Sequence, residues 1–267
     1  MTAFFDLGTF QKGSTSDVKY TPAKYFRWAR AFHFLQNPLV VYTDSTEMER
    51  AFRCSRTHQI NLKIILIHNR TSLLAFEKLD RVKRIFVDPA YPKFHPNTVL
   101  PEYACSQHAK FDLVERAILS DYFGTKYYAW LDIGYFRHTT FRQRDFWITV
   151  PPEMDESKIA VSEVQPSNFN AVDPELIFKQ NIYWVGGGML LGTRDTFSTF
   201  IKELHYAMNY FLSMGLFNTD QQLIYAMFTG SAKEVLNVKT ELQLFSWPFN
   251  WYRNCWFYLG YYCYREQ

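Results

Sequence analysis

One carboxylate stands at the end of a short apolar run. Residues 127–131 read Tyr-Tyr-Ala-Trp-Leu, Asp132 follows directly, and Gly134 comes two positions later. A run of this kind is typical of a strand buried on both faces. Because a charge is costly inside such a strand, we expect Asp132 to lie where the strand leaves the core. A carboxylate there can bind a cation, and Gly134 lets the backbone turn or a ligand approach closely.

Three further apolar runs end in aspartate, at Asp6, Asp44 and Asp88. In an open sheet of parallel strands, ligands bind beyond the carboxyl ends of the strands, so these acids could share one crevice with Asp132. Aspartate is also common in turns and at helix N-caps, and each of the three taken alone fits that structural role. For Asp132 we favour a functional role, because no helical pattern follows it and it therefore has no helix to cap.

The second half of the chain carries three consecutive glycines and another acid. Gly186, Gly187 and Gly188 could let the backbone lie against a ligand, could adopt positive φ, or could mark a bulged strand. Residues 219–222 read Thr-Asp-Gln-Gln, which fits a capping box that opens a helix. Asp220 would then be the first helical residue, where an acid stabilises the helix dipole. That structural role rivals any catalytic one.

The elements that must position these residues alternate in type. Apolar runs predict four strands in the first half, and periodic apolar residues predict helices between them and over residues 102–122. The four strands are expected at residues 2–6, 39–44, 62–68 and 84–88. Later, residues 158–164 suggest a strand, and Asp195 is expected to cap a long helix ending at Gly215. The sequence predicts an α/β fold in one domain, residues 1–267.

Composition limits the class of partner. With 48% hydrophobic and 21% charged residues, the chain is ordinary for a soluble globular protein. A net charge of +3 does not indicate nucleic acid and suits a modestly anionic ligand. No apolar run is long enough to span a membrane. The four cysteines lack zinc-ligand spacing, and a Cys255–Cys263 disulfide is left open.

Familiar nucleotide and hydrolase motifs are absent. There is no Gly-x-Gly-x-x-Gly after the first expected strand, and residues 8–14 approach a P-loop but have Ser14 where the lysine belongs. Neither Gly-x-Ser-x-Gly nor His-Glu-x-x-His occurs. The acids favour a sugar-nucleotide transferase, in which a cation on a strand-end carboxylate and nearby basic residues stabilise the departing diphosphate.

Four blocks of sequence resemble the HtrL/YibB family, over about residues 2–230. They are residues 2–8, 37–44, 130–134 and 219–222, and their order and spacing carry the likeness. The resemblance implies a GT-A-like nucleotide-diphospho-sugar transferase fold, with a mixed central sheet flanked by helices. Residues 1–135 would be a nucleotide-binding half and residues 136–267 an acceptor-binding half. The implied activity is transfer of a sugar from a nucleotide-sugar to a hydroxyl of a glycan or glycolipid; some bacterial members lie near lipopolysaccharide-core genes.

On this resemblance, Asp132 corresponds to the first acid of the Asp-x-Asp signature that holds a metal and the nucleotide-sugar. Gly134 replaces the second acid, so dependence on a divalent cation (Mn or Mg) is left open. Asp6, Gly8 and Asp44 would line the nucleotide pocket.

Further residues are implied for the phosphate and the acceptor. Lys110 could neutralise phosphate, or it could lie on a solvated helix face. Asp220 would be the general base, provided that it lies within hydrogen-bond reach of the acceptor hydroxyl. The acceptor side would include Gly186, Gly187, Gly188 and Gln221.

Two alternatives are kept. On the same fold, the protein could be a catalytically silent sugar- or nucleotide-binding protein, which Gly134 favours. The aromatic tail over residues 245–267 could be core, a platform for sugar rings or a peripheral membrane contact. Without a signal segment, the chain is expected to be cytoplasmic or membrane-peripheral, or in the Golgi lumen if a eukaryotic anchor precedes it.

Overall fold

The computed structural model describes residues 1–13, 18–56, 61–248 and 255–266. Three parallel strands form one sheet, in the order β1 (Thr2–Phe4), β4 (Leu39–Thr43) and β5 (Leu62–Leu66). A second sheet has the order β10 (Glu241–Ser246), β8 (Lys158–Glu163), β9 (Val185–Thr193) and β6 (Tyr127–Leu131). In it β9 runs antiparallel to both neighbours, and β10 runs parallel to β8. The sheets are thus of mixed direction, within an α/β fold.

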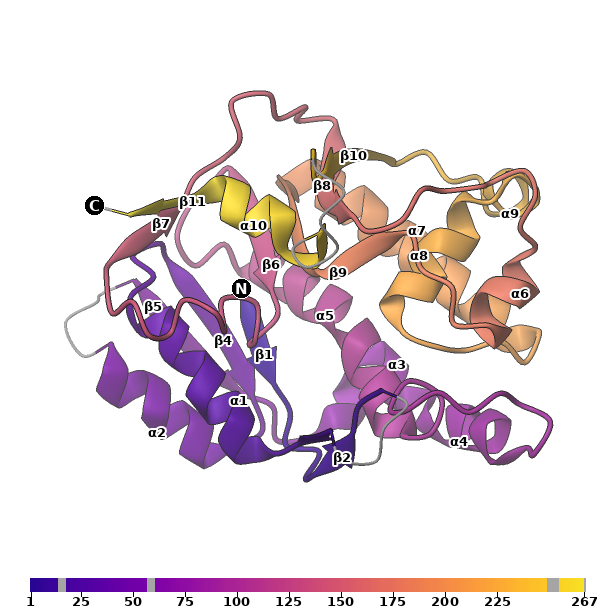
Figure 1. The fold of residues 1–267 in the computed structure, drawn as a ribbon, viewed down its shortest axis with the longest axis horizontal. Helices are drawn as coiled ribbons and strands as arrows, with labels where there is room; N and C mark the ends of the chain where they lie inside the picture. Colours follow the sequence, from indigo (N-terminus) through magenta and orange to yellow (C-terminus); the bar gives the residue numbers. More distant parts are fainter. Residues whose placement is uncertain (14–17, 57–60, 249–254, 267) are drawn as a thin grey trace.

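Backbone hydrogen bonds join the two sheets at Met1. The Met1 nitrogen donates to the Ala129 carbonyl at 2.6 Å, and the Leu131 amide donates to the Met1 carbonyl at 2.9 Å. This is the pattern of parallel neighbours, so β6 lies beside β1. The chain runs outward from β1 to β4 and β5 and then returns to the other side of β1 as β6 (Figure 1). The order of strands therefore reverses between β1 and β6.

Helices cover both faces of the sheets, because alternate strand residues point to opposite faces. In β6, Tyr128 and Trp130 join one hydrophobic cluster, and Leu131 joins the other. The first cluster is covered by α3 (Leu74–Glu77), α4 (Leu79–Val87), α5 (Pro101–Ser120), α6 (Pro174–Lys179), α7 (Arg194–Ser213), α8 (Asp220–Phe228) and α9 (Gly230–Leu236). The second is covered by α1 (Pro22–Ala29), α2 (Thr46–Ser55) and α10 (Tyr258–Cys263).

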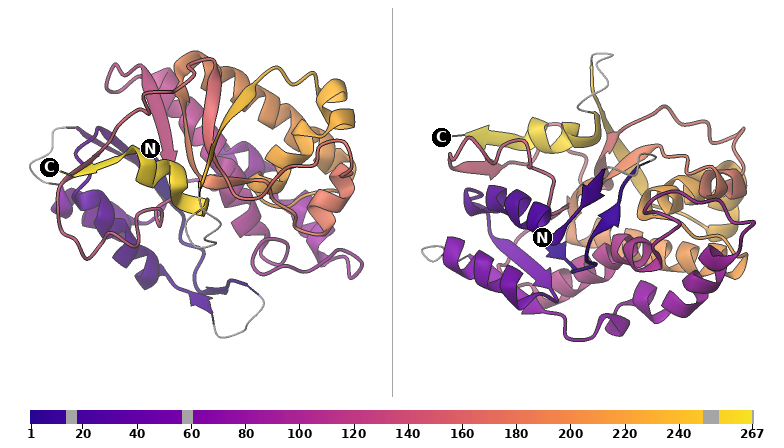
Figure 2. Two further views of the ribbon diagram at one scale, coloured as in Figure 1. Left: turned by 45° about the horizontal axis from the view of Figure 1, so that its top comes forward. Right: turned by 60° about the horizontal axis from the view of Figure 1, so that its bottom comes forward.

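Two short antiparallel ribbons complete the described structure. One pairs β2 (Phe10–Gln11) with β3 (Lys19–Tyr20), and the other pairs β7 (Phe146–Ile148) with β11 (Tyr264–Glu266). Figure 2 shows the yellow C-terminal segment lying beside β7. The C-terminal segment thus returns to the face that carries α1 and α2.

One expected strand and one expected cap are wrong. Residues 84–87 form the end of α4, because Val82 and Phe86, four residues apart, bury one helical face. Asp88 therefore follows a helix and not a strand. Thr193, not Asp195, caps α7, with its hydroxyl accepting from the Thr196 amide at 3.4 Å.

The aromatic tail packs as core over residues 255–266. Leu259 and Cys263 are buried, and the rings of Tyr258, Tyr261 and Tyr262 pack against their cluster. Residues 249–254, which carry Phe249 and Trp251, lie outside the described residues. All four cysteines are free thiols, so the Cys255–Cys263 disulfide does not form. Among the described helices, none is both long and apolar enough to cross a membrane.

Candidate functional site

Two pockets lie at opposite ends of the joined sheets. The carboxyl-end pocket lies beyond the ends of β1 and β6 and has a volume of about 120 Å³. This is smaller than the cavity of about 150 Å³ that binds one benzene molecule, so the pocket takes at most one ring of a ligand in its present shape. The pocket is lined largely by aromatic and charged side chains. They include Lys12, Tyr20, Tyr25, Trp28, Tyr103, Lys110, Trp130, Asp132, Tyr135, Arg137 and Phe257, and Gly134 lies among them.

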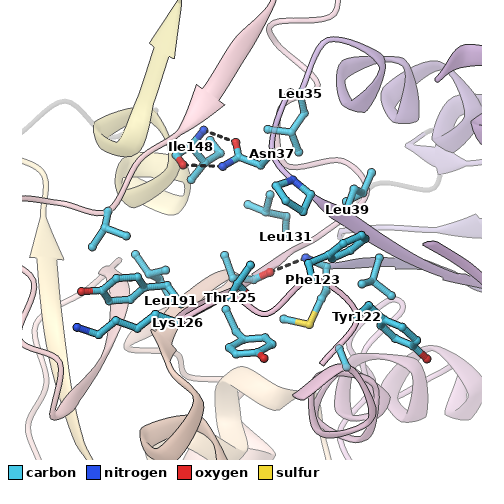
Figure 3. A pocket seen from close by; sticks show the side chains of 18 of the residues that line it. Leu35, Asn37, Leu39, Tyr122, Phe123, Thr125, Lys126, Leu131, Ile148 and Leu191 are labelled. Atoms are coloured by element: carbon cyan, nitrogen blue, oxygen red, sulfur yellow. Dashed lines mark hydrogen bonds between the residues drawn. The ribbon is translucent and has the colours of Figure 1, made fainter. Parts of the chain in front are cut away.

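The amino-end pocket is larger, at about 360 Å³, and mostly aliphatic. Figure 3 shows Leu39, at the start of β4, Leu191, near the end of β9, and Leu131, the last residue of β6, around it. Tyr127, at the start of β6, lines it as well. The Asn37 side chain donates to the Ile148 carbonyl at 3.0 Å and accepts from the Ile148 amide at 2.7 Å. Its side-chain amide is therefore already satisfied by the protein.

Charge distinguishes the pockets more clearly than volume. Both charged side chains of the amino-end pocket are paired, since Asp121 lies 2.6 Å from Arg194 and Lys126 lies 2.6 Å from Glu156. The carboxyl-end pocket has three cationic side chains and one carboxylate. Within the described part of the chain, its Lys12 and Arg137 form no ion pair. The carboxyl-end pocket therefore offers uncompensated positive charge to an anionic ligand.

Lys110 occupies the centre of a cluster formed by α5, β6, β9 and α8. Its Nζ donates to Asp220 Oδ2 at 2.9 Å and to the Gly187 carbonyl at 2.8 Å, and it lies 3.5 Å from Asp132 Oδ1. The Lys110 and Asp220 side chains are 1% and 2% exposed, whereas that of Asp132 is 42% exposed. Of the two carboxylates, Asp132 is therefore the one that reaches the pocket.

The protonation of Lys110 follows from these neighbours. Burial works to lower its pKa, but the Asp132 and Asp220 carboxylates outweigh burial, and the pKa is raised above its ordinary value. Lys110 therefore carries a charged ammonium group. The interpretation of Lys110 as part of a solvated helix face is wrong.

Gly187 explains how the cluster can be this tight. A Cβ atom at Gly187 would overlap Asp220 Oδ2, so the strand approaches the carboxylate at a distance that only glycine permits. The pairing of β8 with β9 also shifts register opposite residues 187–189, which confirms the bulge interpretation. Of the three glycines, Gly188 accepts from the Asp132 amide at 2.8 Å, and Gly186 faces the Trp256 carbonyl. None of the three has positive φ.

Asp220 is the first residue of α8, after Thr219, as the capping pattern predicts. The Thr219 hydroxyl, however, bonds to Gln222 Oε1 at 2.7 Å instead of a helix amide. Gln221 follows on the same turn and is not among the residues that line the carboxyl-end pocket. The structure thus brings Asp220 to Lys110 and leaves Gln221 apart.

Gly134 is held in place by aromatic rings. A Cβ atom at this position would lie 2.8 Å from Trp28 Cε3, so a carboxylate could not be added there without moving the indole. Beyond it, Tyr135 is buried, and its hydroxyl accepts from the Gly260 amide at 3.0 Å. The segment after β6 is therefore fixed between α1 and the C-terminal helix.

Sequence reasoning missed the aromatic and cationic wall. Tyr25 and Trp28 stand at helical spacing in α1, a pattern that resembles ordinary core. Arg137 lies over the Phe257 ring at 4.5 Å and over the Trp28 ring at 5.3 Å. Lys12 donates to the Tyr103 hydroxyl at 3.2 Å. Arg137 could have been suspected from its place three residues after Gly134.

Asp6, Gly8 and Asp44 form a separate network beyond β1 and β4. Asp44 accepts from the Asp6 amide at 2.9 Å and from Arg70 Nε at 2.6 Å, and Asp6 accepts from the Gly8 amide at 2.9 Å. Parallel strands bring these acids to one edge, as expected. Their oxygens are engaged in holding loops, and none of the three residues lines the carboxyl-end pocket.

The oxygen donors at Asp132 do not fit a divalent cation, which needs about six ligands. Asp132 Oδ1 accepts from Trp130 Nε1 at 2.8 Å, Asp220 is engaged by Lys110, and residue 134 has no carboxylate. Over the described ranges, no three His, Cys, Asp or Glu side chains form a group that could hold a metal ion.

Comparison of the chain with known proteins identifies its family but not its activity. No curated protein matches the chain. A crystal structure of mouse xyloside xylosyltransferase 1, in the apo form, is similar at a TM-score of 0.41 and 9% identity, covering 96% of this chain and 92% of that one. Such a likeness is too low to argue from. The family model described as "Bacterial protein of unknown function (HtrL_YibB)" matches residues 1–256. The chain therefore belongs to the HtrL_YibB family.

Proposed function

We propose that the protein is a glycosyltransferase that binds a nucleotide-sugar in the carboxyl-end pocket and transfers the sugar to a hydroxyl of a glycan or glycolipid. The observation that carries the proposal is the place of the pocket. It lies where the order of strands reverses, between the carboxyl ends of β1 and β6. In open α/β sheets that position binds ligands, nucleotides among them. A GT-A-like fold accords with this arrangement.

The lining suits the parts of such a donor. Lys12 and Arg137 supply positive charge for a diphosphate. Trp28 and Phe257 supply ring faces on which a base or a sugar can stack. The volume of about 120 Å³ admits one ring, so the rest of the donor lies over the rim of the pocket.

Asp132 is the acid that we propose to contact the substrate. The Asp132 side chain is partly exposed, and the Trp130 indole holds its Oδ1 in place. Its other oxygen, Oδ2, can therefore meet a ligand in the pocket without rearrangement of the side chain. We propose a positioning role for Asp220, since a general base must reach the acceptor hydroxyl and Asp220 is buried against Lys110.

The rival function is a silent binding protein on the same fold. The specific observation in its favour is Gly134, where Trp28 fills the space that a second acid would need. Both functions predict binding of a nucleotide-sugar, and only the transferase predicts turnover.

The first experiment is thermal unfolding against UDP-, GDP-, CMP- and TDP-sugars, followed by an assay of donor consumption with the sugar that binds. We expect one nucleotide class to raise Tm. We expect Asp132→Asn to lower the rate of transfer at least about 100-fold without lowering Tm in the absence of ligand. Asp121→Asn, at the amino-end pocket, is the control and should keep full activity. A fully active Asp132→Asn variant would refute the assignment, and binding without turnover would establish the silent protein.

A further inference from the structure

The Lys110 ammonium is surrounded as a bound cation would be. Two carboxylate oxygens and one carbonyl oxygen lie 2.8–3.5 Å from Nζ, contributed by Asp132, Asp220 and Gly187. The Trp130 ring centroid lies 5.7 Å from the same atom. Carboxylate and carbonyl oxygens are also the ligands that hard metal ions take in proteins.

The position of this ammonium matters because the two carboxylates would otherwise repel each other. Asp220 is nearly inaccessible, and an uncompensated buried carboxylate is costly. Burial raises the pKa of Asp220, and the Lys110 ammonium opposes that rise, so Lys110 favours the charged carboxylate. Because it also lies beside Asp132, it compensates charge at the pocket floor.

We infer that Lys110 is an internal cation that replaces a divalent metal at this site, so that the site binds its anionic ligand without metal. The inference rests on the proposed function only in the identity of that ligand. Three cationic side chains, Lys12, Lys110 and Arg137, face two carboxylates, so the site retains positive charge for a diphosphate. Lys12 and Arg137 then contact the ligand, and Lys110 compensates the acids beneath it.

If Lys110 takes the place of a metal ion, then its removal should create a metal site. Lys110→Ala leaves the oxygens of Asp132, Asp220 and Gly187 around a vacated position, and these are three ligands of the kind that Mn²⁺ takes, with water to complete its coordination. The variant should therefore gain an Mn²⁺ site that the natural protein lacks. Adding Asp220→Asn to Lys110→Ala removes one of the two carboxylates and should weaken that new site about 10–100-fold.

The experiment is an Mn²⁺ titration followed by electron paramagnetic resonance, with Tm recorded in parallel with and without EDTA. We expect the natural protein to show no Mn²⁺ binding at micromolar concentrations and Lys110→Ala to bind at least about tenfold more tightly. Lys126→Ala is the matched control, because Lys126 is an exposed lysine paired with Glu156, and it should gain nothing. The change of Tm with nucleotide-sugar should be the same with and without EDTA for the natural protein.

Two outcomes would overturn the inference. One is tight Mn²⁺ binding by the natural protein that Asp132→Asn abolishes. The other is a folded Lys110→Ala variant that gains no affinity for Mn²⁺. Should Lys110→Ala fail to fold, the titration of the natural protein decides alone. The titration needs no sugar nucleotide, so failure of every donor to bind would count against the proposed function and not against this inference.

Discussion

The two ends of the joined sheets differ in kind, although β6 contributes residues to both pockets. At the amino end, aliphatic side chains enclose the larger pocket, and its two charged side chains are already paired. At the carboxyl end, the smaller pocket gathers aromatic rings, two unpaired cations and the partly exposed Asp132, within the described residues. Volume alone would favour the amino-end pocket. Charge and the reversal of strand order are the grounds on which we propose the carboxyl end as the ligand site.

Strand β9 crosses from one end to the other and allows a direct comparison, since it has a glycine at each. Gly187→Ala would drive a methyl group into the Asp220 carboxylate, which Lys110 holds in place. Breaking a buried ion pair costs about 3–5 kcal/mol, so we expect a loss of that size in the free energy of unfolding. Loss of ligand binding should accompany it. Urea denaturation and the thermal-shift panel measure the two effects.

Gly192→Ala is the matched substitution at the amino end. Its added Cβ would lie 2.6 Å from Ile159 Cδ1, the movable end of a flexible side chain. We expect a cost of about 1 kcal/mol, at the low end for overpacking, and unchanged ligand binding. Equal losses from the two variants would remove the distinction between the ends.

Acid should also act mainly on the carboxyl end. His108, two residues before Lys110 in α5, is buried, and its Nε2 lies 2.9 Å from the Asn218 carbonyl. Burial lowers the pKa of His108 from 6.5 to about 4. Between these values the unfolded chain binds a proton and the folded chain does not. The contribution of His108 to the free energy of unfolding is therefore fully present above pH 6.5. It is lost as the pH falls to 4, by about 3 kcal/mol.

Urea denaturation at pH 7 and pH 4.5 tests this expectation. His108→Gln keeps a donor for the Asn218 carbonyl but cannot titrate, so the difference between the two pH values should shrink by about 2–3 kcal/mol in the variant. An unchanged difference would show that other groups, and not His108, make the fold sensitive to acid.

The sequence predicted the strands at whose ends the pocket lies better than it predicted the side chains that line the pocket. Asp132 could be placed because an apolar run with one terminal acid has few interpretations, and the parallel strands before Asp6 and Asp44 followed from alternating patterns. Residues 84–88 failed because a short apolar run does not distinguish a strand from the end of a helix. Local spacing along the chain does not predict contacts between residues that are far apart in the sequence. Asp220 meets Lys110 across 110 positions, and Trp28 explains Gly134 only after the chain has folded.

The smallest expected effect compares one cation at each end. Arg137→Met removes a positive charge from the carboxyl-end pocket but keeps a long side chain against Trp28 and Phe257. We expect about a tenfold weaker affinity for the nucleotide-sugar, with Tm nearly unchanged, because a charged hydrogen bond contributes about 1.5–3 kcal/mol before solvent screening. Lys126→Met, which removes the exposed pair with Glu156 and the contact with the Tyr127 ring, should leave affinity as it is. Calorimetric titrations at two salt concentrations measure both. If the two variants bound equally well, or if added salt weakened neither the natural protein nor Lys126→Met, the anionic part of the ligand would have to lie elsewhere than beside Arg137.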